Sequence, residues 1–188
     1  KLSSLKVDFK GFYYLPKIIK AAKLGDAAIL KEIINILAKE KINVMSSIRY
    51  NPELTLPKGT HTTLKPKNYE LISIRKGIQS LSRLNAYDHA QGLVVRNSSI
   101  IAIENSKGTK KMLQSIKKLK NSKGILIKFP KKKQDLRVDL PTIGLDTLKD
   151  CKNSGINGIV LKSKQNIFLD KDKSLNFANR NNIFITVK

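Results

Sequence analysis

The sequence predicts an α/β protein in which a mixed α/β C-terminal domain follows the remnant of an N-terminal, Rossmann-like α/β domain. Two observations carry this prediction. Segments with the apolar spacing of helices alternate with short apolar runs typical of strands, and a stretch with three prolines and one glycine, 51–66, interrupts the alternation. The chain is therefore expected to comprise residues 1–50, an interdomain linker at 51–65 and a C-terminal domain at 66–188.

The N-terminal part is expected to hold two helices and one short strand. The helices are predicted at 12–22 and 26–40, with Asp26 as the N-cap of the second. The apolar run at 42–45 predicts a buried strand. Because these elements cannot easily bury their own apolar faces, we expect the first strands of this domain to be absent from the chain.

The C-terminal part alternates more regularly. Its predicted elements are, in order, a helix at 67–85, strands at 91–96 and 100–104 joined by an Asn97-Ser98 turn, a helix at 109–120, a strand at 124–129, an irregular loop at 131–144, a helix at 145–153, strands at 157–161 and 166–169, a helix at 172–181 and a strand at 183–187. The 109–120 helix is expected to turn Met112, Ile116 and Leu119 inward.

The composition excludes several classes of protein. With 40% hydrophobic residues, the chain is globular, and it has no apolar run long enough to cross a bilayer. Its single cysteine, Cys151, rules out an internal disulfide and a cysteine zinc cluster, and is expected in the core. A cytoplasmic setting fits. His61 and His89 are isolated, so neither can be paired with a carboxylate from the sequence.

The net charge of +23 allows several interpretations. An AT-rich genome encodes many lysines without any functional demand. Nucleic acid, an anionic membrane surface or a phosphate-bearing substrate would each also favour basic residues. Aromatic residues make up only 6% of the chain and tryptophan is absent, which argues against nucleic acid.

The string QDLRVDLPTIG (134–144) holds the richest cluster of chemical groups. It follows a predicted strand, where α/β folds place ligands. If it is extended, Asp135, Arg137 and Asp139 lie on one side and the intervening apolar residues on the other. Two carboxylates can hold a divalent cation or orient water, and arginine can bind phosphate, while Thr142 precedes a predicted helix start. The alternative is a solvated charge ladder.

A second cluster lies in ENSKGTK (104–110). Glu104 ends a predicted strand and could act as a metal ligand or base, and Gly108-Thr109 opens a helix that could receive an anion. The alternative is an ordinary strand–turn–helix joint. Lys128 and Lys131 flank the next strand end, and both could reach a pyrophosphate.

The string QDLRVDLPTIG is preceded by GILIKFPKK. Five other segments accompany it and run essentially end to end: LPKIIKAAKLGDAAILKEI, ELTLPKG, SRLNAYDHAQGLVV, IAIENSKGT and IFLDKDKSLNFANRNNIFITV. In order and spacing, these segments together resemble one family, the bacterial UDP-2,3-diacylglucosamine pyrophosphatases of lipid A synthesis, of the LpxI type, and QDLRVDLPTIG is the strongest of them.

The resemblance implies a Mg²⁺-dependent hydrolase of Gram-negative bacteria. Such enzymes split UDP-2,3-diacylglucosamine into 2,3-diacylglucosamine 1-phosphate (lipid X) and UMP, with water attacking the α-phosphorus in a cleft between two domains. It further implies a cytoplasmic enzyme, peripheral to the inner membrane, that contacts the membrane surface transiently. No specific nucleic-acid partner is expected, and an oligomer is possible.

The resemblance also assigns residues. Asp139 matches the family's essential acid, in its RVDLPT string, and Asp135 is a supporting carboxylate; both are candidate Mg²⁺ ligands. The positions implied for substrate contact are Arg137, Thr142, Lys128, Lys131, Gln91, Glu104, Gly108 and Thr109.

The chain departs from the family pattern in three places, one of which is His89-Ala90, where a small or Gly-containing pair is more common before Gln91. A Gly-rich opening strand–helix unit is absent, so an N-terminally truncated member is expected. Lys107 and Lys110 flank Gly108-Thr109 where acids are usual. Two alternatives of other classes therefore stay open, a sugar-nucleotide-binding protein without turnover and a basic nucleic-acid-binding module.

Overall fold

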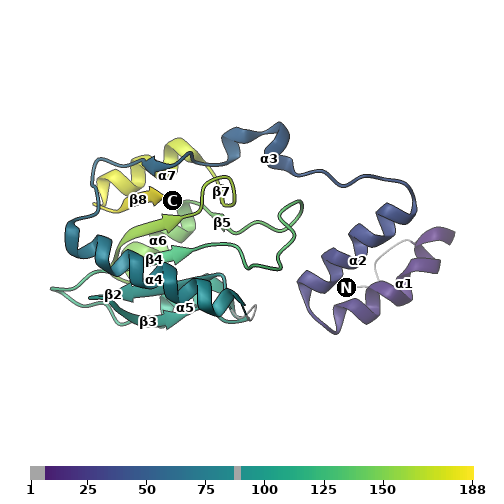
Figure 1. Ribbon diagram of the computed structural model, residues 1–188, viewed down its shortest axis with the longest axis horizontal. Coiled ribbons are helices and arrows are strands. Elements are labelled where there is room, and N and C mark those ends of the chain that lie inside the picture. The colour runs from purple at the N-terminus through teal and green to yellow at the C-terminus, as the bar shows by residue number, and fades with distance from the viewer. Residues whose placement is uncertain (1–6, 87–89) are drawn as a thin grey trace.

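The computed structural model describes residues 7–86 and 90–188, so His89 lies outside the described residues. A helical hairpin at the N-terminal end stands apart from an α/β body (Figure 1). Its helices, α1 (Phe9–Ala22) and α2 (Asp26–Lys39), confirm both predictions for this part. Asp8 caps α1 by accepting the Gly11 N–H at 2.7 Å. The N-cap of α2 is Gly25 rather than the predicted Asp26, which is the first helical residue.

The strand predicted at 42–45 is wrong. This segment is irregular, and Ile42 and Met45 are 52% and 42% exposed. A strand needs a neighbour to receive its backbone hydrogen bonds, and within the described residues none pairs with this run. The chain continues through α3 (Ser47–Tyr50) and the 3₁₀ helix η2 (Pro52–Leu54) to the body.

A mixed sheet forms the centre of the body, which confirms the α/β class. Its order is β1-β8-β6-β4-β2-β3. β4, β6 and β8 are parallel, whereas β2 runs antiparallel to both β3 and β4, and β1 antiparallel to β8. The strands are β1 (Gly59–Thr60), β2 (Gly92–Arg96), β3 (Ser99–Ile103), β4 (Gly124–Lys128), β6 (Ile156–Leu161) and β8 (Phe184–Val187).

Part of the predicted linker belongs to this body. β1 pairs with β8 at the edge of the sheet, with Thr60 opposite Thr186. Leu56 is 3% exposed and packs in the core. The segment therefore contributes packing as well as connection, and the division of the chain into domains at the stated boundaries stays a prediction.

Helices cover both faces of the sheet (Figure 1). On one face, α4 (Asn68–Ala86) packs against Leu93 and Val95 of β2, while Val94 points to the opposite face, as the alternation of a strand requires. The opposite face is covered by α5 (Gly108–Gln114), α6 (Leu145–Asn153) and α7 (Lys171–Arg180). A small second sheet pairs β5 (Thr142–Ile143) with β7 (Ile167–Phe168).

Helix α5 is shorter than the predicted 109–120 helix. The Arg96 guanidinium donates from Nη1 to the Lys117 carbonyl at 3.1 Å, and this contact holds the following segment outside a helix. Leu119, predicted to face inward, is 38% exposed, whereas Met112 is buried as predicted. Cys151 is fully buried in the core, also as predicted. Among the described residues no helix is both long and apolar enough to cross a membrane.

Candidate active site

The candidate site begins at the edge of the sheet where β3 and β4 end and β2 begins. The register of β2 places its first residues beside the last residues of both neighbours. Glu104 donates its N–H to the Gly92 carbonyl at 2.9 Å, and Phe129 donates its N–H to the Gln91 carbonyl at 2.9 Å. Topology thus brings together Gln91, Glu104 and Lys128, which lie far apart in the sequence.

A buried polar cluster lies at this edge. The Lys128 ammonium is 3.2 and 3.3 Å from the two carboxylate oxygens of Glu104, and the Thr109 hydroxyl donates to the same carboxylate at 2.7 Å. Lys128 also donates to the Thr109 oxygen. Burial lowers the pKa of Lys128, while Glu104 and, less strongly, Asp139 act to raise it. Lys128 is therefore a partner of Glu104, and its ammonium is not free in solvent.

The loop after β4 differs from the extended conformation considered for it. The backbone turns at Asp135, whose carbonyl accepts the Val138 and Asp139 N–H groups at 3.1 and 2.9 Å. Asp135 and Arg137 form an ion pair at 2.7 Å. Hydrogen bonds from Arg137 lower the pKa of Asp135. Val138, predicted to anchor the loop, is 38% exposed.

This turn separates the two aspartates. In the extended form they would share one side of the chain with Arg137 between them. Among the described residues, Arg137 instead forms an ion pair only with Asp135. Asp139 is left to line two adjoining cavities, and the smaller one, of about 300 Å³, also contains Asp135. The structure thus gives the two carboxylates unequal surroundings.

The larger cavity, of about 670 Å³, lies between the helical hairpin and the carboxyl edge of the sheet. Residues 24–27 of the hairpin line one side, and the Ser46 hydroxyl bonds the Leu136 carbonyl at 3.5 Å nearby. The volume falls in the range of small-molecule sites. Half of the ten predicted site residues line it: Gln91, Glu104, Gly108, Lys131 and Asp139.

The lining is unusually acidic for this chain. Three carboxylates, from Asp26, Glu104 and Asp139, face two ammonium groups, from Lys131 and Lys133. Acids therefore make up a larger share of this lining than of the whole chain, in which 14 of 188 residues are Asp or Glu. Mixed charge of this kind suits an anionic substrate that arrives with, or beside, a cation.

The comparisons with known proteins bear on this cavity. The family model for the LpxI C-terminal domain matches residues 57–186. The chain belongs to the LpxI family. One relative is the UDP-2,3-diacylglucosamine pyrophosphatase LpxI of Caulobacter vibrioides, which is 30% identical over an alignment of 191 residues that covers 97% of this chain and 68% of the relative. The LpxI match includes the sheet edge and the aspartate loop.

The Mg²⁺ ion expected from the resemblance stays a prediction, and the carboxylates near the cavity limit how it could be held. Within the described residues no three side chains of His, Cys, Asp or Glu converge to form a metal site. Mg²⁺ commonly takes only one or two carboxylates and completes its shell with water and substrate phosphates. Asp139 faces both cavities and can supply such a carboxylate, whereas Asp135 is already held by Arg137.

The remaining predicted residues do not line this cavity. Thr142 is exposed in β5, and its hydroxyl donates to the Leu140 carbonyl at 3.1 Å. Lys128 and Thr109 each donate a hydrogen bond to the Glu104 carboxylate. The roles of all ten residues stay predictions, because position alone does not assign them.

Asp26, Asn105 and Gln134 line the cavity but are absent from the predicted site. A signal for Asp26 existed in the helix–Gly-Asp–helix segment, which resembles the family. From the sequence alone, Asp26 is expected only as a helix cap.

Proposed function

We propose that this chain carries the hydrolytic site of a UDP-2,3-diacylglucosamine pyrophosphatase. The products would be 2,3-diacylglucosamine 1-phosphate and UMP, as a step of lipid A synthesis. Family membership and the printed activity of the Caulobacter relative support the reaction. The observation that carries the proposal for this chain is the cavity where Asp139 meets Gln91, Glu104, Gly108 and Lys131.

Asp139 is the proposed catalytic carboxylate. It orients a water molecule toward the α-phosphorus and accepts a proton as the new P–O bond forms. The bond between the α-phosphorus and the bridging oxygen breaks, and that oxygen leaves with the lipid phosphate. Lys131 and Lys133 line the same cavity and oppose the negative charge on the phosphoryl oxygens.

Asp139 would also hold the Mg²⁺ ion, and Asp26 is a further carboxylate of the lining, whereas Glu104 is already paired with Lys128. When bound beside the pyrophosphate, Mg²⁺ neutralises charge on its oxygens. Asp135, engaged by Arg137, would act by fixing the loop that presents Asp139. The acylated substrate resides in a membrane, so we propose transient contact between the chain and the membrane surface, favoured by its lysine excess.

An Asp139→Asn variant tests this function. We expect UMP release from UDP-2,3-diacylglucosamine with Mg²⁺ to fall by roughly 10²–10⁴-fold, the usual range for a lost general base. The matched control is Asp146→Asn, because Asp146 lies on α6 with its side chain 95% exposed, and it should keep the wild-type rate. Wild-type chain that yields no UMP, or an Asp139→Asn variant as active as wild type, would contradict the proposal.

Two further measurements separate the parts of the mechanism. Chelation of Mg²⁺ should abolish turnover, and added Mg²⁺ should restore it. In water labelled with heavy oxygen, attack at the α-phosphorus places the label in UMP, whereas label in the lipid phosphate would show attack at the other phosphorus. If Asp139→Asn binds the substrate intact, the enzyme hypothesis is supported over a binding protein without turnover.

A further inference from the structure

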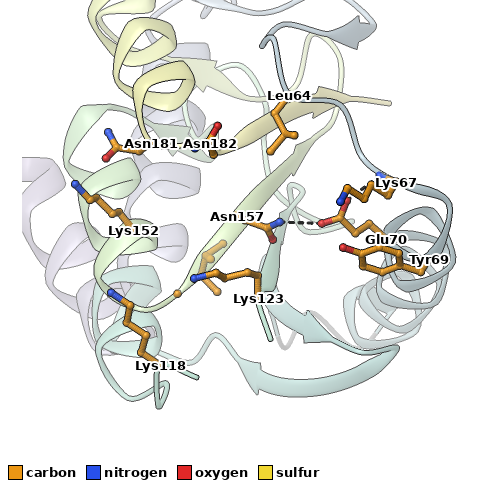
Figure 2. A pocket seen from close by; sticks show the side chains of 12 residues that line it. Leu64, Lys67, Tyr69, Glu70, Lys118, Lys123, Lys152, Asn157, Asn181 and Asn182 are labelled. Atoms are coloured by element: carbon orange, nitrogen blue, oxygen red, sulfur yellow. Dashed lines mark hydrogen bonds between the residues drawn. The ribbon is translucent and has the colours of Figure 1, made fainter. Parts of the chain in front are cut away.

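A second cavity lies at the opposite end of the sheet from the candidate active site. Its volume is about 410 Å³. It opens where β4 and β6 begin, between the start of α4 and the ends of α6 and α7 (Figure 2). The lining comes from four stretches of the body: the start of α4 with the residues before it, the loop before β4, the connection from α6 into β6, and the end of α7.

This cavity is strongly basic. Lys67, Lys118, Lys123 and Lys152 line it, and Figure 2 shows them approaching from different sides. Within residues 7–86 and 90–188, no ion pair engages any of these four ammonium groups. Like charges gathered around one hollow repel each other, and an anion placed among them would reduce this repulsion. The Lys152 ammonium also lies 5.9 Å from the centre of the Phe177 ring.

The one acid of the lining is already bonded within the protein. Glu70 is 5% exposed. One of its carboxylate oxygens accepts the Lys67 backbone N–H at 2.7 Å, and the other accepts from the Asn157 side-chain amide at 2.8 Å. Glu70 thus fixes the start of α4 against β6. It offsets only part of the lysine charge.

The loop that carries Lys118 and Lys123 is held in place. Arg96, at the end of β2, donates to the Lys117 carbonyl at 3.1 Å, and Ser122 donates to the Asn97 side chain at 3.3 Å. Gly155 permits close packing, since a Cβ at this position would lie 3.1 Å from Lys118 Cγ. The lysines therefore extend from a fixed backbone frame.

Arg96 does not line the cavity, but it adds positive charge at the same end of the sheet, where β2 ends. The residue is 9% exposed, and its Nε and Nη2 atoms have no hydrogen-bond partner among the described residues. Arginine stays protonated, so a buried guanidinium with two unpaired donors is costly. A nearby anion would offset part of this cost.

We propose that this cavity binds a phosphate-bearing ligand about the size of a nucleotide. The lysines supply point charges for phosphate groups. Tyr69, 60% exposed, and Leu64 offer an aromatic and an apolar surface for a base or sugar. The site is separate from the proposed hydrolytic cavity, and its lining shares no residue with that cavity.

The same chemistry could come from a free nucleotide or from a phospholipid headgroup. The first arm of the test titrates ADP into wild-type chain by calorimetry and repeats the titration with a Lys118→Gln/Lys152→Gln variant. The control is Lys162→Gln/Lys173→Gln, which removes the same charge from two exposed lysines outside the cavity. The second arm measures sedimentation with phosphatidylcholine vesicles that contain or lack phosphatidylglycerol.

We expect the cavity variant to bind ADP about tenfold or more weakly than wild type, and the control to change by less than about twofold. Asp139→Asn should leave ADP affinity unchanged, which separates this site from the hydrolytic one. The side-chain amide resonances of Asn157 should shift on binding.

If ADP does not bind but phosphatidylglycerol vesicles retain wild type and the control and lose the cavity variant, the ligand is a lipid headgroup. Equal weakening of both variants in both arms would show general polycation attraction and overturn the proposal, as would no binding in either arm. Neither result depends on whether the chain hydrolyses a sugar nucleotide.

Discussion

Lys128 and Glu104 form a buried ion pair behind the candidate active site, with their side chains 5% and 4% exposed. Glu104 lines the larger cavity, whereas Lys128, the last residue of β4, does not. The two residues are brought together only because β2 pairs with both β3 and β4. The position of Glu104 in the site therefore depends on the register of the sheet.

Breaking this pair should destabilise the fold. Lys128→Met leaves a buried carboxylate without its cation, and Glu104→Gln leaves the ammonium without its anion, so each should lower the free energy of unfolding by about 3–5 kcal/mol. The double variant should lose less than the sum of the two, because no charge is then left unpaired. Urea denaturation of all four proteins measures this coupling.

The surface pair of Lys149 and Asp146 provides the control, since its side chains are 53% and 95% exposed. The corresponding single and double variants of Lys149 and Asp146 should each change the free energy of unfolding by no more than about 0.5 kcal/mol. Strict additivity at Lys128 and Glu104 would show that the buried contact contributes no coupling.

The pKa of Lys128 predicts a pH dependence of stability. Burial lowers this pKa below its ordinary value of 10.5. The unfolded chain therefore binds the proton more tightly, and the contribution of Lys128 to the free energy of unfolding rises with pH between the folded and unfolded pKa values. We expect the free energy of unfolding of wild type, minus that of Lys128→Met, to rise as pH increases toward 10.5. A difference that falls over this interval would contradict the assignment.

Most of the fold could be predicted from the sequence because its signals are local. The spacing of apolar residues identified α4, and Asn97-Ser98 identified the β2–β3 hairpin, where both residues have positive φ, 49° and 62°. The prediction of a strand at 42–45 was wrong because an apolar run forms a strand only when it can pair with the edge of a sheet. That condition depends on the rest of the fold.

The candidate site was predictable in composition but not in geometry. Asp139, Glu104 and Lys131 do line one cavity. The turn that frees Asp139 depends on the ion pair of Asp135 with Arg137, and alternation along an extended chain does not anticipate such a turn. Nor does any local pattern show that residues 24–27 face the sheet edge, since this depends on how separate elements pack.

Gly92 should be required for the position of Glu104. A Cβ at Gly92 would lie 2.5 Å from Glu104 Oε2, and that carboxylate cannot move freely because Lys128 and Thr109 bond it. We expect Gly92→Ala to lower the free energy of unfolding by about 1–3 kcal/mol, as overpacking does. Thermal or urea denaturation measures the change.

A second background tests whether the carboxylate is the cause. In a Glu104→Ala/Lys128→Met chain the obstructing group is gone, so Gly92→Ala should cost clearly less there than in wild type. An equal cost in both backgrounds would assign the effect to the backbone of β2 instead.

Cys151 should report the opening of the core. Its thiol is fully buried, and burial raises its pKa, so the reactive thiolate is scarce in the folded state. A thiol reagent should therefore label it only through unfolding, at a rate that rises with urea. An added thiol at an exposed position of α4, Ser82→Cys, should react at once under the same conditions. If Cys151 in the folded wild-type chain reacts as fast as that thiol, α6 is not packed against the sheet as the structure shows.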